Sequence, residues 1–89
     1  MRSLTTPQFW KLYHALPEEI SRRADRAYKL WQINPNAHGL YFKRVGGRQP
    51  VYSVRIGPDY RALGLRDGDA ILWFWIGPHD VYERMIGQM

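Results

Sequence analysis

The chain has 89 residues, enough for one domain around a single core, and its 45% hydrophobic content excludes an intrinsically disordered protein. It has no cysteine, which excludes disulfide frameworks and thiolate metal sites, and no apolar stretch long enough to cross a bilayer. A formal net charge of +5 favours polyanionic partners. The first residues contain no apolar leader segment, so we expect one domain over residues 1–89, in the cytoplasm and without a membrane partner.

Two helices are predicted in the N-terminal third of the chain. Thr6 and Pro7 have the residue types of an N-cap and a first helical position, and Pro17 both ends this helix and begins the next. The second helix is expected to end at Asn34, because Pro35 pushes that residue out of the helical region. Apolar residues at helical spacing mark both segments: Phe9, Leu12, Tyr13 and Leu16 in the first, and Ile20, Ala24, Ala27 and Trp31 in the second.

Four segments downstream have the length and composition of strands, at residues 40–45, 51–56, 60–65 and 70–76. Glycine, proline and aspartate separate the last three, so short turns make these strands antiparallel neighbours. The last segment, Ala70–Ile76, has no polar interruption, which indicates a strand covered on both faces in the middle of the sheet.

The predicted fold is α+β. An N-terminal two-helix hairpin packs on one face of a four-stranded, mainly antiparallel sheet, with room for a short extra strand at the N-terminus. We expect the other face of the sheet to be open for function.

Two arginines flank the turn at Gly57–Asp59. If the strands on either side of this turn pair symmetrically, Arg55 and Arg61 lie opposite or diagonal to each other on one face. Such a like-charge pair is repulsive, and it is better tolerated where an anion or an acidic partner lies between the two cations. The alternative is a register that differs by one residue, which leaves two ordinary surface arginines.

A polar segment follows the apolar strand. The imidazole of a histidine such as His79 can act as an acid or a base, and Asp80 or Tyr82 could orient it or take part in the proton transfer. The alternative is that His79 and Asp80 cap a turn and Tyr82 packs over the edge of the sheet. No His, Cys or carboxylate spacing indicates a metal ligand set, and no cofactor is expected.

The other basic residues form two groups with different expected roles. Lys43, Arg44 and Arg48 are placed to join Arg55 and Arg61 around the open face. Aromatic residues interleave with these basic residues, as in a surface that stacks bases, although most of them are expected to be core: Tyr41, Phe42, Tyr52 and Tyr60. The basic residues of the second helix, Arg22, Arg23, Arg26 and Lys29, are more typical of a solvated helix face than of a nucleic-acid contact.

The sequence resembles the RelE/ParE superfamily of toxins from type II toxin-antitoxin modules. The hairpin that starts at Tyr52 and reaches Tyr60 and Arg61 is the most specific part of the likeness. The rest occurs in the family's order and spacing over nearly the whole chain: Phe9 and Trp10, Leu16 and Pro17, Leu30 and Trp31, Asn34 and Pro35, Leu40 to Lys43, Trp73 to Gly77, His79 and Tyr82.

The resemblance implies a toxin that cleaves mRNA, usually within the ribosome, by activating a ribose 2′-hydroxyl against the adjacent phosphate. Arg61 and Arg55 match basic residues of the family's site, and Tyr82 matches a tyrosine near the end of the chain. We expect catalytic roles for these three residues and for His79, which could supply proton transfer. RNA contacts would come from Lys43, Arg44, Arg48 and Ser53, and Ser53 stands where the best-known ribonuclease members have lysine. His79 stands near an arginine of those members.

The resemblance also implies a partner, which is an acidic antitoxin that wraps the basic surface and covers the open face. Two other functions share this fold. ParE-type relatives poison DNA gyrase without a ribonuclease residue set, and a relative that is no longer toxic would keep only the fold.

Overall fold

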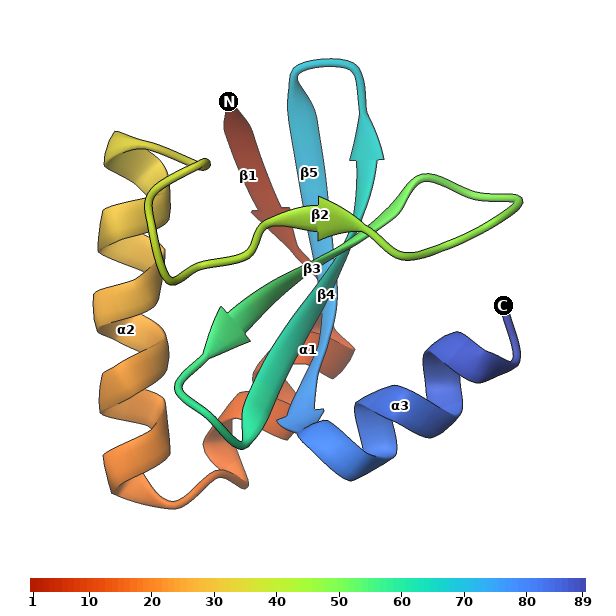
Figure 1. Cartoon of the computed structure of the whole chain (residues 1–89). Coiled ribbons are helices and arrows are strands. Elements are labelled where there is room, and N and C mark those ends of the chain that lie inside the picture. The colour runs from red at the N-terminus through yellow and green to blue at the C-terminus, as the bar shows by residue number, and fades with distance from the viewer.

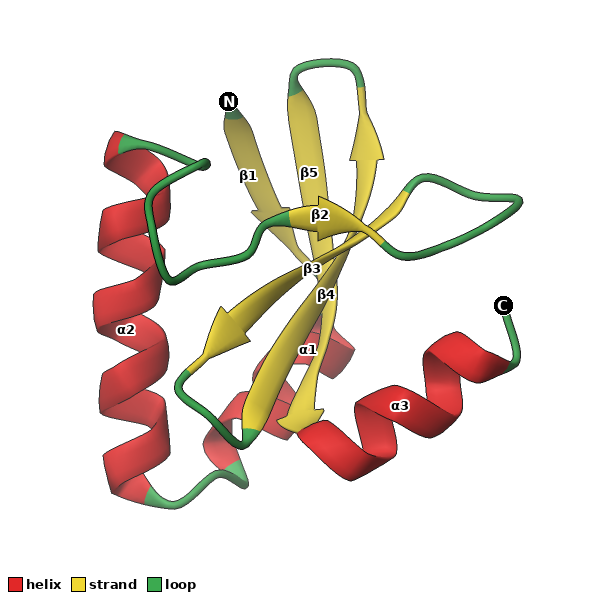
Figure 2. Ribbon diagram, in the orientation of Figure 1, coloured by secondary structure: helices red, strands yellow, loops and turns green.

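The computed structural model describes all 89 residues as a mixed five-stranded sheet with three helices (Figures 1 and 2). The strand order in the sheet is β1-β5-β4-β3-β2. The α+β class and the two N-terminal helices are therefore confirmed. The elements in chain order are β1 (Arg2–Thr5), α1 (Pro7–His14), α2 (Glu18–Ile33), β2 (Lys43–Arg44), β3 (Val51–Ile56), β4 (Tyr60–Asp67), β5 (Ala70–Pro78) and α3 (His79–Gly87).

Both N-terminal helices begin where the sequence predicts and α2 ends at Asn34 as predicted, but α1 ends at His14, before Leu16 and Pro17. The side-chain oxygen of Thr6 accepts a hydrogen bond from the backbone N–H of Phe9 at 3.1 Å, which caps α1. Pro17 occupies the N-cap position of α2, and Asn34 ends α2 in an extended conformation. Both helices pack on the same face of the sheet, where Ala24 and Trp31 join the larger of two core clusters.

The extra N-terminal strand is confirmed as β1, which runs parallel to β5 at the edge of the sheet. The strand predicted to be in the middle, residues 70–76, is β5, but β4 occupies the central position. The expectation that β5 is covered on both faces is confirmed, because Ile71 and Trp73 belong to the larger core cluster and Phe74 and Trp75 pack against the smaller one.

The strand predicted over residues 40–45 is wrong in its extent, because only Lys43–Arg44 pairs as β2. Gly39 and Tyr41 both have positive φ angles, of 92° and 48°, which break the extended backbone. Leu40 is nevertheless buried, and its carbonyl accepts a hydrogen bond from the N–H of Arg55 at 2.7 Å.

The alternative in which His79 and Asp80 cap a turn is also wrong, since His79 begins helix α3. Tyr82, Met85 and Ile86 follow at i, i+3 and i+4, and this short apolar pattern packs against β4 and β5 on the second face. In Figures 1 and 2, α3 lies on the opposite side of the molecule from α2. The face expected to be open is therefore partly covered by α3.

Gly64 sits at an irregularity between β4 and β5, where Leu63 pairs with Trp75, Gly64 pairs with Trp73, and Phe74 has no partner. A Cβ atom on Gly64 would lie 2.6 Å from Cγ1 of Ile71 and 2.8 Å from Cε3 of Trp73. Both neighbouring side chains are buried and cannot swing away. The missing side chain of Gly64 therefore permits this close packing.

Gly64→Ala is accordingly expected to lower the free energy of unfolding by about 1–3 kcal/mol through overpacking. Gly87→Ala is the matched control, because Gly87 has no positive φ and a Cβ there would meet nothing within 4 Å. Chemical denaturation of both variants measures the difference. Equal stability of the two would contradict the close packing at Gly64.

Tyr13 and Asp25 join α1 to α2, because the Tyr13 hydroxyl donates a hydrogen bond to Oδ1 of Asp25 at 2.7 Å. This hydrogen bond, aided by burial and by the carboxylate charge, raises the pKa of Tyr13 above its ordinary value of 10.0. The resulting stabilisation is complete below the pKa of tyrosine in the unfolded chain and is lost as the pH rises through the higher pKa of the folded chain.

Asp25→Asn is therefore expected to lower the pKa of Tyr13 toward its ordinary value and to leave the other tyrosines unchanged. The Cζ resonance of Tyr13, followed by NMR through alkaline pH, measures this shift. An unchanged titration of Tyr13 in the variant would show that Asp25 does not hold its proton.

No helix of the chain combines the length and the apolar character needed to span a membrane.

Candidate functional site

A polar cleft of about 240 Å³ lies on the face of the sheet that carries α3. Strands β2, β3 and β4, the segment before β2, and α3 all contribute to it. The cleft brings together the four residues predicted to be catalytic and two of those predicted to contact RNA. Its lining residues are Tyr41, Lys43, Ser53, Arg55, Arg61, His79, Tyr82 and Glu83.

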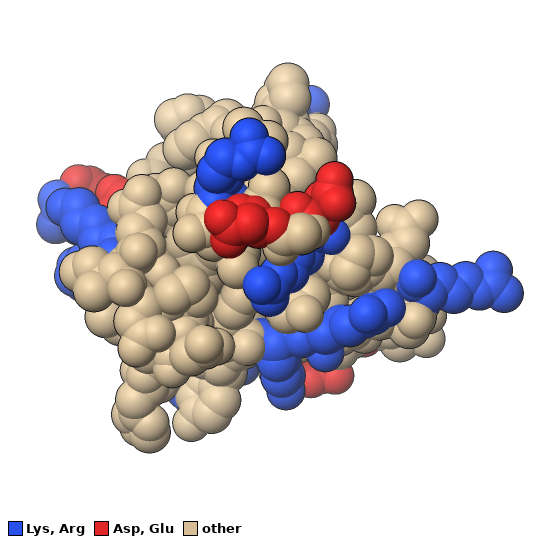
Figure 3. Space-filling model, turned by 90° about the horizontal axis from the view of Figure 1, so that it is seen from above, with Lys and Arg blue, Asp and Glu red and all other residues tan.

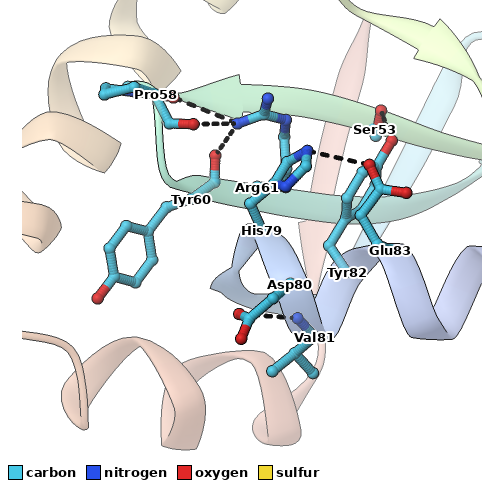
Figure 4. Close-up of polar contacts among 10 residues, drawn as sticks. Ser53, Pro58, Tyr60, Arg61, His79, Asp80, Val81, Tyr82 and Glu83 are labelled. Atoms are coloured by element: carbon cyan, nitrogen blue, oxygen red, sulfur yellow. Dashed lines mark hydrogen bonds and ion pairs between the residues drawn. The ribbon is translucent and has the colours of Figure 1, made fainter.

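Arg55 and Arg61 lie directly opposite each other across β3 and β4, which confirms the symmetric register. The turn between these strands holds both guanidinium groups. The carbonyl of Gly57 accepts hydrogen bonds from Nε of Arg55 at 3.1 Å and from Nη1 of Arg61 at 3.2 Å. Arg61 also donates to the carbonyl of Tyr60 at 2.8 Å (Figure 4). Neutral carbonyls thus orient two cations toward one cleft.

Neither arginine forms an ion pair with a carboxylate within 4.0 Å. Burial lowers the pKa of Arg61, and the nearby charge of Arg55 lowers it further. Arginine nonetheless stays protonated at neutral pH, so the repulsion between the two cations persists. An anion placed between them would relieve this repulsion.

Aromatic rings flank both cations. The guanidinium carbon of Arg55 lies 5.5 Å from the ring centroid of Tyr41, and that of Arg61 lies 5.8 Å from the ring centroid of Tyr82. These are cation–π distances, which favour a fixed position for each guanidinium group.

His79 is paired with Glu83, a residue that the sequence analysis did not select. Nε2 of His79 lies 3.1 Å from Oε1 of Glu83, one helical turn further along α3 (Figure 4). At this distance an Nε2–H group donates to the carboxylate, which leaves Nδ1 of a neutral imidazole free to accept a proton. The spacing i, i+4 could have identified Glu83, had α3 been predicted as a helix.

The prediction that Asp80 could orient His79 is wrong. Oδ1 of Asp80 accepts a hydrogen bond from the backbone N–H of Val81 at 3.0 Å, in the first turn of α3. Asp80 is exposed and lies away from the cleft in Figure 4. The start of α3 is anchored instead by the backbone N–H of His79, which donates to the carbonyl of Asp59 at 2.7 Å.

Tyr82 and Ser53 form the floor of the cleft. Tyr82 is only 5% exposed and Ser53 only 2%. The Tyr82 hydroxyl donates to Oγ of Ser53 at 3.3 Å, so each satisfies a buried polar group of the other. The ring of Tyr82 lies 5.6 Å from the ring of His79, which places the phenol beneath the imidazole.

Of the other three basic residues predicted to surround the open face, only one lines the cleft. Lys43 lines the cleft, but Arg44 points to its own turn, where it donates to the carbonyls of Gly46 and Gly47. Arg48 is exposed in the loop before β3 and does not line the cleft. Of the aromatic residues interleaved with them, only Tyr41 lines the cleft, since the others pack against the larger core cluster: Phe42, Tyr52 and Tyr60.

Basic side chains are also spread beyond the cleft. In Figure 3, which views the molecule from above, Lys and Arg occupy several parts of the surface and lie among acidic side chains near the middle. On α2, Arg22 pairs with Glu18 and Arg23 with Glu19, so both are ordinary charged pairs of a solvated helix face. The unpaired positive charge of the cleft therefore belongs to Arg55, Arg61 and Lys43.

This arrangement can bind a phosphate and move a proton. Two arginines and a lysine offer charged donors to an anion, and His79 with Glu83 supplies an acid or base beside them. No group of three or more His, Cys, Asp or Glu residues could hold a metal ion.

Comparison with solved structures shows the same fold in several toxins. The chain aligns with RelE of the archaeal RelE-RelB complex from Pyrococcus horikoshii at 21% identity and a TM-score of 0.68, over 86% of this chain and 92% of that one. The RelB-RelE complex from Methanococcus jannaschii aligns at 23% identity and a TM-score of 0.69, over 92% of this chain and 96% of that one. YafQ from Escherichia coli aligns at 11% identity and a TM-score of 0.73, over 92% of this chain and 98% of that one. No curated protein matches the sequence.

A match to a protein-family model identifies the family of this chain. The model described as the ParE-like toxin domain matches residues 18–84, which include α2 and every residue that lines the cleft. This match spans well over half of the 89 residues. The chain therefore belongs to the ParE-like toxin domain family, and its fold is that of the RelE and YafQ toxins.

Proposed function

We propose that this toxin cleaves mRNA, with the cleft between β2, β3, β4 and α3 as its active site. The observation that carries the proposal is the unpaired, half-buried pair Arg55 and Arg61 beside the pair formed by His79 and Glu83. Two cations without carboxylate partners favour a bound anion, and an RNA phosphate is the anion that the resemblance to ribonuclease toxins suggests.

In the proposed reaction, Nδ1 of His79 accepts the proton of a ribose 2′-hydroxyl. The 2′-oxygen then attacks the adjacent phosphorus, and Arg55 and Arg61 stabilise the charge that develops on the phosphate oxygens. The bond from phosphorus to the 5′-oxygen breaks, and the imidazolium of His79, held by Glu83, returns a proton to that oxygen. The products are a 2′,3′-cyclic phosphate and a 5′-hydroxyl.

Lys43 and Tyr41 are placed to contact the RNA next to the scissile phosphate, as a charged donor and an exposed stacking ring. Ser53 and Tyr82 hold the floor of the cleft. Arg44 and Arg48 lie outside it and would contact RNA only as flanking phosphate contacts.

Incubation of the purified protein with mRNA, with and without translating ribosomes, tests the proposal. We expect transcripts cut to 2′,3′-cyclic phosphate and 5′-hydroxyl ends. Cutting only in the presence of ribosomes would identify the ribosome as a required partner. Intact mRNA in both arms would refute the enzymatic activity.

A second candidate function is favoured by the family model itself, which is ParE-like. A ParE-type toxin would bind DNA gyrase and have no catalytic step. It would inhibit supercoiling by purified gyrase and leave mRNA intact, and the growth arrest it causes would survive His79→Ala. The supercoiling assay and the cleavage assay therefore separate the two functions.

Both functions require an antitoxin. In both archaeal structures RelE is in complex with RelB, and this chain carries a net charge of +5, which suits an acidic partner. We propose an acidic antitoxin that covers the cleft. Coexpression of the adjacent gene should restore growth and yield a complex that survives purification at moderate salt.

A further inference from the structure

The geometry of the cleft depends on the turn at Gly57–Asp59. The carbonyl of Gly57 accepts hydrogen bonds from Nε of Arg55 at 3.1 Å and from Nη1 of Arg61 at 3.2 Å. One oxygen atom therefore orients both guanidinium groups, and a rotation of the peptide group that holds this carbonyl would release both. Gly57 has a φ of 67°, and glycine adopts many other conformations at little steric cost, so its residue type does not fix this peptide group.

A side chain from helix α2 covers this glycine. Nη1 and Cδ of Arg23 lie 3.0 and 3.4 Å from the point that a Cβ atom on Gly57 would occupy. Figure 1 shows the first half of α2 beside the turn that joins β3 to β4. Arg23 and its neighbour Arg22 each pair with a glutamate one helical turn earlier, but the side chain of Arg23 is 38% exposed and that of Arg22 is 68% exposed. Beyond its charged pair, Arg23 therefore also packs against the turn.

Another turn of the chain has the same local geometry without such a cover. Gly68 has a φ of 57°, and its carbonyl accepts a hydrogen bond from Nε of Arg66 at 3.2 Å. A Cβ atom on Gly68 would meet nothing within 4 Å. The turn therefore forms without a covering side chain, so its local structure alone does not require Arg23. What distinguishes Gly57 is that its carbonyl holds two arginines that line a cleft.

We infer that Arg23 is a positioning residue for the cleft. By packing over Gly57 from α2, it keeps the carbonyl of Gly57 directed at Arg55 and Arg61, which preorganises their guanidinium groups for a phosphate. Arg23 itself does not line the cleft. The inference rests on the proposed function, because it takes the cleft as the site of an anion.

Arg23→Ala tests the inference through the binding of inorganic phosphate to the full chain, labelled with ¹⁵N and followed by NMR. We expect phosphate to bind roughly two- to tenfold more weakly than to the wild type, which is the cost of ordering a long side chain on binding. The Nε–H signal of Arg55 should lose its protection from exchange with water. The Nε–H signal of Arg66, which is bonded to Gly68, should stay as in the wild type and serves as the internal reference.

Two further variants separate packing from charge. Arg23→Met removes the charge and keeps an unbranched side chain that reaches past the position of Cδ, so it should retain the phosphate affinity and the Arg55 signal of the wild type. Arg22→Ala is the matched control, because Arg22 is the neighbouring residue, forms the same kind of pair with Glu18 and is more exposed. This control should also bind phosphate as the wild type does.

The outcomes distinguish this inference from the proposed function. An unchanged phosphate affinity in Arg23→Ala would overturn the inference and leave the ribonuclease proposal standing. Equal losses in Arg23→Met and Arg23→Ala would overturn it as well, because the charge of Arg23 rather than its packing would then support the anion. The absence of saturable phosphate binding to the wild type would overturn both the inference and the anion site. Intact mRNA, with phosphate binding as expected, would refute only the ribonuclease function.

Discussion

Arg61→Ala is expected to lower the rate of mRNA cleavage by roughly 10²–10³-fold, the usual effect of removing one preorganised donor to transition-state charge. Arg61 reaches the cleft because the carbonyls of Gly57 and Tyr60 hold its guanidinium group. Truncation also relieves the repulsion from Arg55, the residue directly opposite. The thermal stability of the variant should therefore equal or exceed that of the wild type, so lost cleavage would not reflect unfolding.

Arg66→Ala is the matched control for this prediction. Arg66 also lies on β4, and its Nε donates to the carbonyl of Gly68 two residues later at 3.2 Å, as Nε of Arg55 does to Gly57. Its guanidinium group, however, lies over Tyr52, which packs with the core on the face that carries α1 and α2. Arg66→Ala removes the same positive charge away from the cleft and should retain cleavage.

Arg61→Lys separates charge from geometry. A lysine keeps the positive charge and loses the planar fork that binds two phosphate oxygens, so intermediate cleavage is expected. Full cleavage by Arg61→Ala would exclude Arg61 from the active site. Growth arrest by Arg61→Ala with intact transcripts and impaired supercoiling would favour the gyrase-binding alternative.

The two N-terminal helices and the hairpin formed by β3 and β4 could be predicted from the sequence because their signals are local. Thr6 and Pro7 mark one helix start, Pro17 marks the next, and the turn at Gly57–Asp59 sets the register that places Arg55 opposite Arg61. In each case the residues that determine the structure are adjacent in the chain.

The errors came from features that depend on tertiary packing. Strand β2 is short because Tyr41 takes a positive φ. A tyrosine rarely adopts this conformation, so the sequence does not predict it. Helix α3 spans only nine residues, and its apolar residues Tyr82, Met85 and Ile86 are stabilised by packing against the sheet rather than by helix propensity. Without α3 in the prediction, Glu83 could not be identified as the partner of His79, because only a helix brings the two side chains together.

His79→Ala is expected to reduce cleavage by roughly 10²–10⁴-fold, which is the range for loss of a general acid or base. The imidazole sits at the first residue of α3, where the backbone N–H of His79 is bonded to Asp59. Its side chain is 41% exposed, so truncation leaves no buried void and the fold should persist. The rates at which the wild type and the variant form cleavage products measure the effect. Equal unfolding midpoints of the two proteins show that the variant is folded.

Glu83→Gln and Asp80→Asn decide whether His79 acts with a carboxylate partner. Glu83 lies 3.1 Å from Nε2 of His79, whereas Asp80 is adjacent in sequence and bonds to the N–H of Val81. Both substitutions remove one negative charge from α3. Glu83→Gln should slow cleavage, because a neutral amide no longer stabilises the imidazolium that forms during proton transfer. Asp80→Asn should leave the rate of cleavage unchanged. Equal rates for the two variants would mean that the contact between His79 and Glu83 has no part in proton transfer.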